Sequence, residues 1–240
     1  MGAINRFLNP NPYETRIEDK DAARYVIARR VKDLPDDVAW EVVDIAQRIR
    51  IALDKAMIDL VIHNERGTSG VGFPFGGIDR ATGQPSEFPG ARLDHIKKKL
   101  TCEQWEFIIA QRPHPGGNET LWSINEVANS DKHRQGLVRV IPRLSQDVTM
   151  GIGPLGNVAR IDCIEVMPSK HDFPLADKER ETVLIAKSRN DTNFRVDQTI
   201  TAAVIFGNVE PVEGKNVLTT LNEQMRTVQC ILKGFRGFFR

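Results

Sequence analysis

The chain has 240 residues, of which 40% are hydrophobic and 27% charged, a globular composition that excludes a disordered chain. The formal net charge is +1, so bulk charge provides no attraction to nucleic acid or to an acidic membrane. No stretch approaches the ~20 apolar residues of a membrane helix. The three cysteines, Cys102, Cys163 and Cys230, are odd in number and far apart, which indicates reduced thiols. We therefore expect a cytoplasmic protein with no membrane partner.

The first 36 residues predict an arm and one strand. Residues 1–22 are polar and contain Pro10 and Pro12, which is typical of a flexible arm. In residues 23–31, Tyr25 and Ile27 alternate with smaller or charged neighbours, which predicts a strand. A Leu-Pro-Asp-Asp sequence then supplies a break and a helix N-cap.

A long helix is predicted over residues 37–64. Its apolar residues recur at steps of three and four and form one buried stripe: Val42, Ile45, Ala46, Ile49, Leu53, Ala56 and Leu60. The opposite side is charged and should be solvated: Asp44, Arg48, Lys55 and Asp59. Arg50 and Asp54 lie four residues apart on a flank of the stripe. We expect this pair to be at least partly buried, so it needs partners.

A glycine-rich segment, residues 66–90, predicts a long loop anchored by Phe73-Pro74-Phe75. It lacks the G-K-[ST] ending of a phosphate-binding loop. A lid over a site is the alternative, because long loops are often functional. Two short helices follow at 91–100 and 101–111, and Asn118 is placed to cap a helix over 119–138.

After Pro142 the hydrophobic period changes to two. The candidate strands are 148–152, 159–166, 182–187 and 199–206, which predict an antiparallel sheet. A last helix, 216–234, carries an apolar seam that should pack on this sheet: Leu218, Leu221, Met225, Val228, Leu232 and Phe235. The predicted fold is α+β, a single domain over 23–240. Its helical part is 23–142, and its antiparallel sheet plus C-terminal helix is 143–240.

Three segments, residues 44–55, 73–75 and 121–134, resemble those of an uncharacterised bacterial family. Its members carry a helix with a pattern like G-D-x-x-H-N-L-R-S-A-L-D-H, an F-P-[IF] segment and a second helix with N-x-D-K-H-R. Here the first helix reads D-I-A-Q-R-I-R-I-A-L-D-K over 44–55, and 73–75 match the F-P-F segment. The string L-W-S-I-N-E-V-A-N-S-D-K-H-R over 121–134 matches the second helix. The resemblance covers about residues 23–140 and implies no established activity.

The family's R-x-x-x-x-H string is also similar to the motif of HEPN ribonucleases and toxins. In those proteins an arginine and a histidine on one helix act on an RNA phosphodiester without metal. In this chain the string runs from Arg50 to Lys55, so the histidine is absent. That departure counts against the activity here.

The candidate site residues are His133, Asp131, Arg134, Asn129, Arg50 and Asp54. In one interpretation Asp131 and Arg134 pair with Arg50 and Asp54 in a structural network that docks two helices. In the other, His133 is a general base or acid and an arginine stabilises a phosphate-like transition state.

No metal or cofactor is predicted, because the five histidines show no ligand spacing and no dinucleotide or nucleophile-elbow motif occurs. The favoured function is an accessory or binding protein with a structural Arg/Asp/His network, whose partner could be a protein or RNA. The alternatives are a HEPN-like, metal-independent ribonuclease, or its degenerate form, and a small-ligand binding module.

Overall fold

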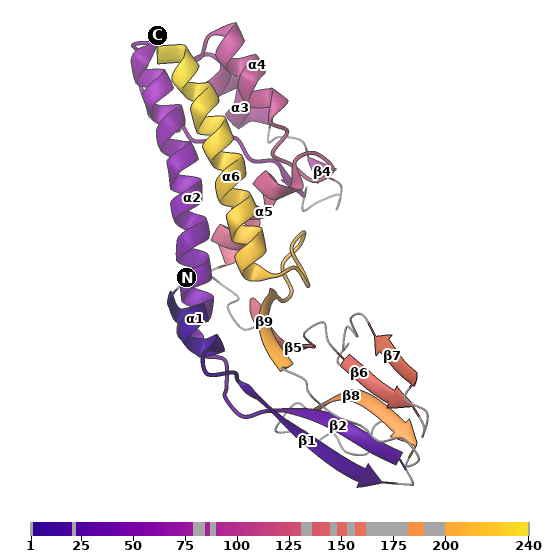
Figure 1. Cartoon of the computed structure of the whole chain (residues 1–240). Helices are drawn as coiled ribbons and strands as arrows, with labels where there is room; N and C mark the ends of the chain where they lie inside the picture. The colour runs from indigo at the N-terminus through magenta and orange to yellow at the C-terminus, as the bar shows by residue number, and fades with distance from the viewer. Residues whose placement is uncertain are drawn as a thin grey trace. The chain divides into compact units, whose positions relative to one another are not determined.

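The computed structural model describes residues 2–20, 23–78, 85–86, 90–130, 136–144, 148–152, 157–161, 182–189 and 200–239. Within these ranges the predicted α+β class is confirmed, with long helices and small antiparallel sheets (Figure 1). The chain divides into two compact units, residues 1–38 with 139–204, and residues 39–138 with 205–240. This division differs from the predicted boundary near residue 142, because each unit draws on both halves of the chain. None of the described helices is both long and apolar enough to cross a membrane.

The first unit begins with α1 (Gly2–Leu8) and β1 (Tyr13–Lys20), so the prediction of a flexible arm over 1–22 is wrong. The arm folds because Ala3, Ile4 and Phe7 are spaced to share one buried face of a helix. Lys32 holds α1 in place by donating to the carbonyls of Arg6 at 3.1 Å and Phe7 at 3.2 Å. Tyr13 is also buried, and its hydroxyl donates to the Val140 carbonyl at 3.2 Å.

The strands of the first unit form several small sheets. β1 pairs antiparallel with β2 (Ala23–Arg30), and β2 pairs antiparallel with β8 (Thr182–Arg189). A second pair joins β6 (Val148–Ile152) to β7 (Asn157–Ile161), also antiparallel. β5 (Val138–Leu144) pairs with β9 (Ile200–Phe206). Strands are therefore present in the described parts of all four positions predicted after Pro142, with residues 162–166 and 199 outside the described ranges, but they are divided among three sheets.

The second unit is helical, apart from the short pair β3 (Gly77–Ile78) and β4 (Pro85–Ser86). Its helices are α2 (Asp36–His63), α3 (Gly90–Lys97), α4 (Cys102–Ala110), α5 (Glu119–Asn129) and α6 (Val217–Arg236), followed by the 3-10 helix η2 (Gly237–Phe239). An N-cap side chain marks the start of α4, α5 and α6, since Thr101, Asn118 and Asn216 each accept a backbone N–H of the first turn. The predicted positions of α2, α3, α4 and α6 are confirmed.

The core of this unit joins α2 to α6 and to the shorter helices. Leu53, Met57 and Leu60 of α2 pack in one cluster with Val228, Ile231 and Phe235 of α6. Figure 1 shows α2 and α6 running side by side. The apolar seam of α6 is therefore buried against helices, whereas we expected it to lie on the sheet.

The helix predicted over 119–138 ends earlier, at Asn129, with Ser130 as its C-cap. Residues 131–135 lie outside the described ranges. Gly136 has a φ of 89°, a left-handed conformation that ends regular structure. Val138 already belongs to β5, because its β-branched neighbours Val140 and Ile141 favour extended backbone.

One polar side chain interrupts the α5–α6 interface. We predicted that Met225 faces the core, but it is 41% exposed, while Gln224 beside it is 0% exposed. Gln224 Nε2 donates to Ser123 Oγ at 2.8 Å, and Gln224 Oε1 has no hydrogen-bond partner among the described residues. A buried polar atom without a partner is a source of instability.

We therefore expect Gln224→Met to leave the free energy of unfolding unchanged or to raise it by up to about 1 kcal/mol. Methionine has a similar volume, and Ser123 keeps its hydrogen bond to the Thr120 carbonyl at 2.7 Å. Urea unfolding of the two proteins measures the difference. Gln224→Glu is the matched control and should lose stability, because it buries a charge.

Candidate functional site

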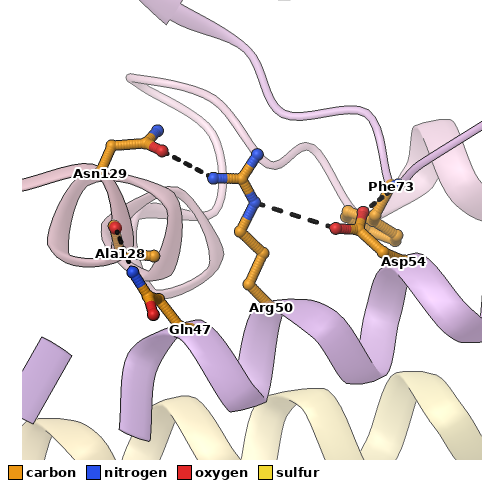
Figure 2. A network of polar contacts seen from close by, with 6 residues as sticks. All are labelled: Gln47, Arg50, Asp54, Phe73, Ala128 and Asn129. Atoms are coloured by element: carbon orange, nitrogen blue, oxygen red, sulfur yellow. Dashed lines mark hydrogen bonds and ion pairs between the residues drawn. The ribbon is translucent and has the colours of Figure 1, made fainter. Parts of the chain in front are cut away.

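The described part of the candidate site centres on Arg50, at the middle of α2. Its Nη1 donates to Asn129 Oδ1, at the last residue of α5, over 2.7 Å. Its guanidinium carbon lies 5.7 Å from the centre of the Phe75 ring, a cation–π distance. Its Nε lies 4.0 Å from Asp54 Oδ2, one helical turn along α2. Figure 2 shows the arginine between these two partners. We call Arg50, Asp54, Phe73, Phe75 and Asn129 the Arg50 cluster.

Asp54 joins α2 to the loop that follows it. Its Oδ1 accepts the backbone N–H of Phe73 at 2.7 Å, a short bond of the charge-assisted kind. Phe73 is only 3% exposed, so its N–H has little access to water. The carboxylate therefore satisfies a buried donor while it also faces Arg50.

The segment before and after Phe73 is held by further contacts. Lys99 Nζ donates to the carbonyls of Gly67 and Ser69, each at 2.7 Å, and His95 Nε2 lies 2.9 Å from the same Ser69 carbonyl. Gly76 N donates to the Pro113 carbonyl at 2.9 Å. Anchoring of the loop at Phe73-Pro74-Phe75 is thus confirmed. Residues 79–84 and 87–89 are not described, so the lid hypothesis stays a prediction.

The prediction of a partly buried pair is confirmed for two of these residues, and the contact of the third, Asn129, with Arg50 was not predicted. Arg50 and Asp54 are partly buried as predicted, with side chains 30% and 33% exposed, and Asn129 lies beside Arg50. Asp131, His133 and Arg134 lie outside the described residues, so their predicted pairing and catalytic roles are untested. Among the described residues, Arg50 donates to the neutral amide of Asn129.

Two participants were missed, the Phe73 N–H and the Phe75 ring. A backbone donor leaves no trace in the residue pattern, so Phe73 could not be found by motif. The Phe75 ring carried a signal, because an aromatic residue in an anchored loop is a common partner for a nearby arginine. Gln47 adds a longer contact to α5, donating to the Ala128 carbonyl at 3.4 Å (Figure 2).

The Arg50 cluster contains few groups that could take part in a reaction. Arg50 and Asp54 have opposite charge, so the described cluster is close to neutral. Lys55, which stands where the HEPN-like string has histidine, is exposed and lies about 140° around α2 from Arg50. Among the described residues, no group of three or more histidine, cysteine or acidic side chains could hold a metal ion. Cys102 and Cys230 are exposed free thiols.

Comparisons with known proteins identify no relative of this chain. No family model matches the chain, and neither the curated proteins nor the solved structures contain a match. The resemblance to a bacterial family and the likeness to HEPN proteins therefore stay predictions.

Proposed function

We propose that this chain is a non-catalytic accessory or binding protein in which the Arg50 cluster has a structural role. The observation that supports the proposal is that the polar contacts of Arg50 and Asp54 join three separate segments of the chain. These contacts tie α2 to the end of α5 and to the Phe73 segment. Contacts of this kind hold the segments together, and we call the Arg50–Asn129 and Asp54–Phe73 contacts the clamp.

The geometry gives less support to a ribonuclease. A metal-independent ribonuclease needs a general base or acid beside the arginine. On α2, the residue five positions after Arg50 is Lys55, which lies about 140° around the helix from Arg50. The described neighbours of Arg50 are an amide, an aromatic ring and a carboxylate that also accepts the Phe73 N–H.

The proposal predicts a protein with no ribonuclease activity whose stability depends on Arg50. In buffer with EDTA, we expect single-stranded RNA to stay intact with the parent protein, as it does in a blank. We expect Arg50→Met to lower the free energy of unfolding by about 1 kcal/mol, because it removes one hydrogen bond and one cation–π contact. Urea unfolding gives this value.

The matched control is Arg48→Met, two residues away on the charged side of α2. Arg48 is 75% exposed and forms an i,i+4 ion pair with Asp44 at 2.9 Å. Its replacement should cost less than about 0.5 kcal/mol, as is usual for surface pairs. RNA cleavage by the parent that disappears in His133→Ala would contradict the proposal and favour the HEPN-like alternative.

A further inference from the structure

The outer edge of the Arg50 guanidinium is not used by the clamp. Nη1 is bonded to Asn129 and Nε faces Asp54, whereas no hydrogen bond of Nη2 is found among the described residues. A guanidinium carries its donors in a rigid, planar fork. Fixing one side of the group therefore also fixes the direction of the free N–H donors.

Asn129 supplies a second outward donor. Because an arginine can only donate, the amide oxygen of Asn129 must face Arg50, and this fixes the orientation of the amide. Its Nδ2 then points away from the bond. Figure 2 shows this nitrogen and the outer nitrogen of Arg50 on the same side of the bond between the two residues. Asn129 is exposed and Arg50 is 30% exposed, so a solute can reach both.

Two adjacent sets of N–H donors, one of them cationic, match the oxygens of a small anion. The Asp54 carboxylate lies 4.0 Å from Nε and already balances part of the charge of Arg50, the only cation of the Arg50 cluster. A singly charged carboxylate fits this balance. A doubly charged phosphate would have a larger desolvation cost to offset at a site with one partly balanced cation.

The geometry points to a carboxylate-binding site on the outer edge of the Arg50–Asn129 pair. The carboxylate accepts hydrogen bonds from Arg50 Nη2 and Asn129 Nδ2, and it belongs to a small acid or to an acidic side chain or C-terminus of a partner. The site rests on the proposed function, since the clamp is what keeps the guanidinium fixed before the ligand arrives. Pre-orientation of this kind reduces the entropy lost on binding.

The experiment uses sodium acetate as the probe, with sodium chloride at the same ionic strength as the blank. Two-dimensional ¹H–¹⁵N NMR follows the side-chain amide of Asn129 and the backbone N–H of Phe73. We expect a saturable shift with acetate in the parent protein. Asn129→Asp should weaken acetate binding by roughly tenfold or more, because it replaces the outward donor by a carboxylate oxygen.

Asn129→Asp separates this site from the clamp, because its carboxylate can still accept from Arg50 and should keep the urea midpoint at or above that of the parent. Asn129→Ala, at an exposed helix position, is the second variant and should show the same loss of binding. Arg48→Ala is the control and should bind acetate as the parent does. For the variants, the readout is the Phe73 N–H.

An acidic peptide and its fully amidated form distinguish a partner protein from a small acid as the source of the carboxylate. Either source supports the site if binding is lost in both Asn129 variants. The inference is overturned if the parent shows no saturable response, if both Asn129 variants bind acetate normally, or if phosphate saturates the same signals more tightly than acetate. The proposed function fails on a different result, namely RNA cleavage or an unchanged stability of Arg50→Met.

Discussion

Replacement of Asp54 by alanine is expected to lower the free energy of unfolding by about 1–3 kcal/mol. The change removes the acceptor of the Phe73 N–H, which is buried, and leaves Arg50 without its opposite charge. An unpaired buried donor accounts for most of the cost. A fully buried ion pair would lose about 3–5 kcal/mol when broken. The smaller value applies here because both side chains are about one-third exposed and their closest atoms are 4.0 Å apart.

Two further variants test the cause of this loss. Asp54→Asn keeps an oxygen that can accept the Phe73 N–H, so it should recover part of the stability. Asp59→Ala removes an exposed carboxylate from the same helix and should change stability by less than about 0.5 kcal/mol. Urea unfolding of all three provides the comparison. Equal midpoints for Asp54→Ala and Asp59→Ala would mean that the Arg50 cluster contributes nothing to stability.

Gly234→Ala is expected to destabilise the protein by about 1–3 kcal/mol, although alanine is the better helix former. In an exposed helix the same change would gain about 1 kcal/mol. Gly234 lies in α6 where α4 packs on it, and an added methyl group would overlap Cζ of Phe107 and lie 2.6 Å from its Cε2. The Phe107 ring contacts Phe235 at 5.6 Å and Phe238 at 5.5 Å between ring centres, so it has little room to move.

Gly237→Ala is the matched control three residues further on. An added methyl group at Gly237 meets no atom within 4 Å, and its φ of −62° suits alanine. Its stability should therefore stay within about 0.5 kcal/mol of the parent. Phe107→Leu combined with Gly234→Ala tests the mechanism, because the smaller side chain removes the overlap and the two changes should be less than additive. Additive losses would show that Phe107 is not the group that Gly234 accommodates.

These experiments examine two kinds of close contact in the same helical unit. At Asp54 the contact is polar and links a helix to a loop. At Gly234 it is steric and sets the separation of α4 from α6. The Arg50–Asn129 pair depends on the first kind, because Arg50 can present its outer edge only while the α2, α5 and Phe73 segments are held together.

The sequence by itself determined the elements whose signals are local. The stripe at three- and four-residue steps predicted α2, and its expected charged side, Asp44, Arg48, Lys55 and Asp59, is exposed. Asn118 marked the start of α5, because a cap depends only on residues within one turn. The same periodicity placed Arg50 and Asp54 on a partly buried flank. Caps and periodic stripes depend only on residues that are close in sequence, so they can be predicted without the tertiary structure.

Only the tertiary structure decided which surfaces and partners meet. Arg50 finds Asn129 at a separation of 79 residues, and Asp54 finds a backbone N–H that no side-chain pattern reveals. The seam of α6 packs on α2. Residues 2–8 form a helix and residues 13–20 a strand, because long-range burial stabilises segments whose own pattern is weak. Periodicity specifies that a face is apolar. Which apolar face covers it depends on the relative stability of competing packings, which is a property of the whole chain.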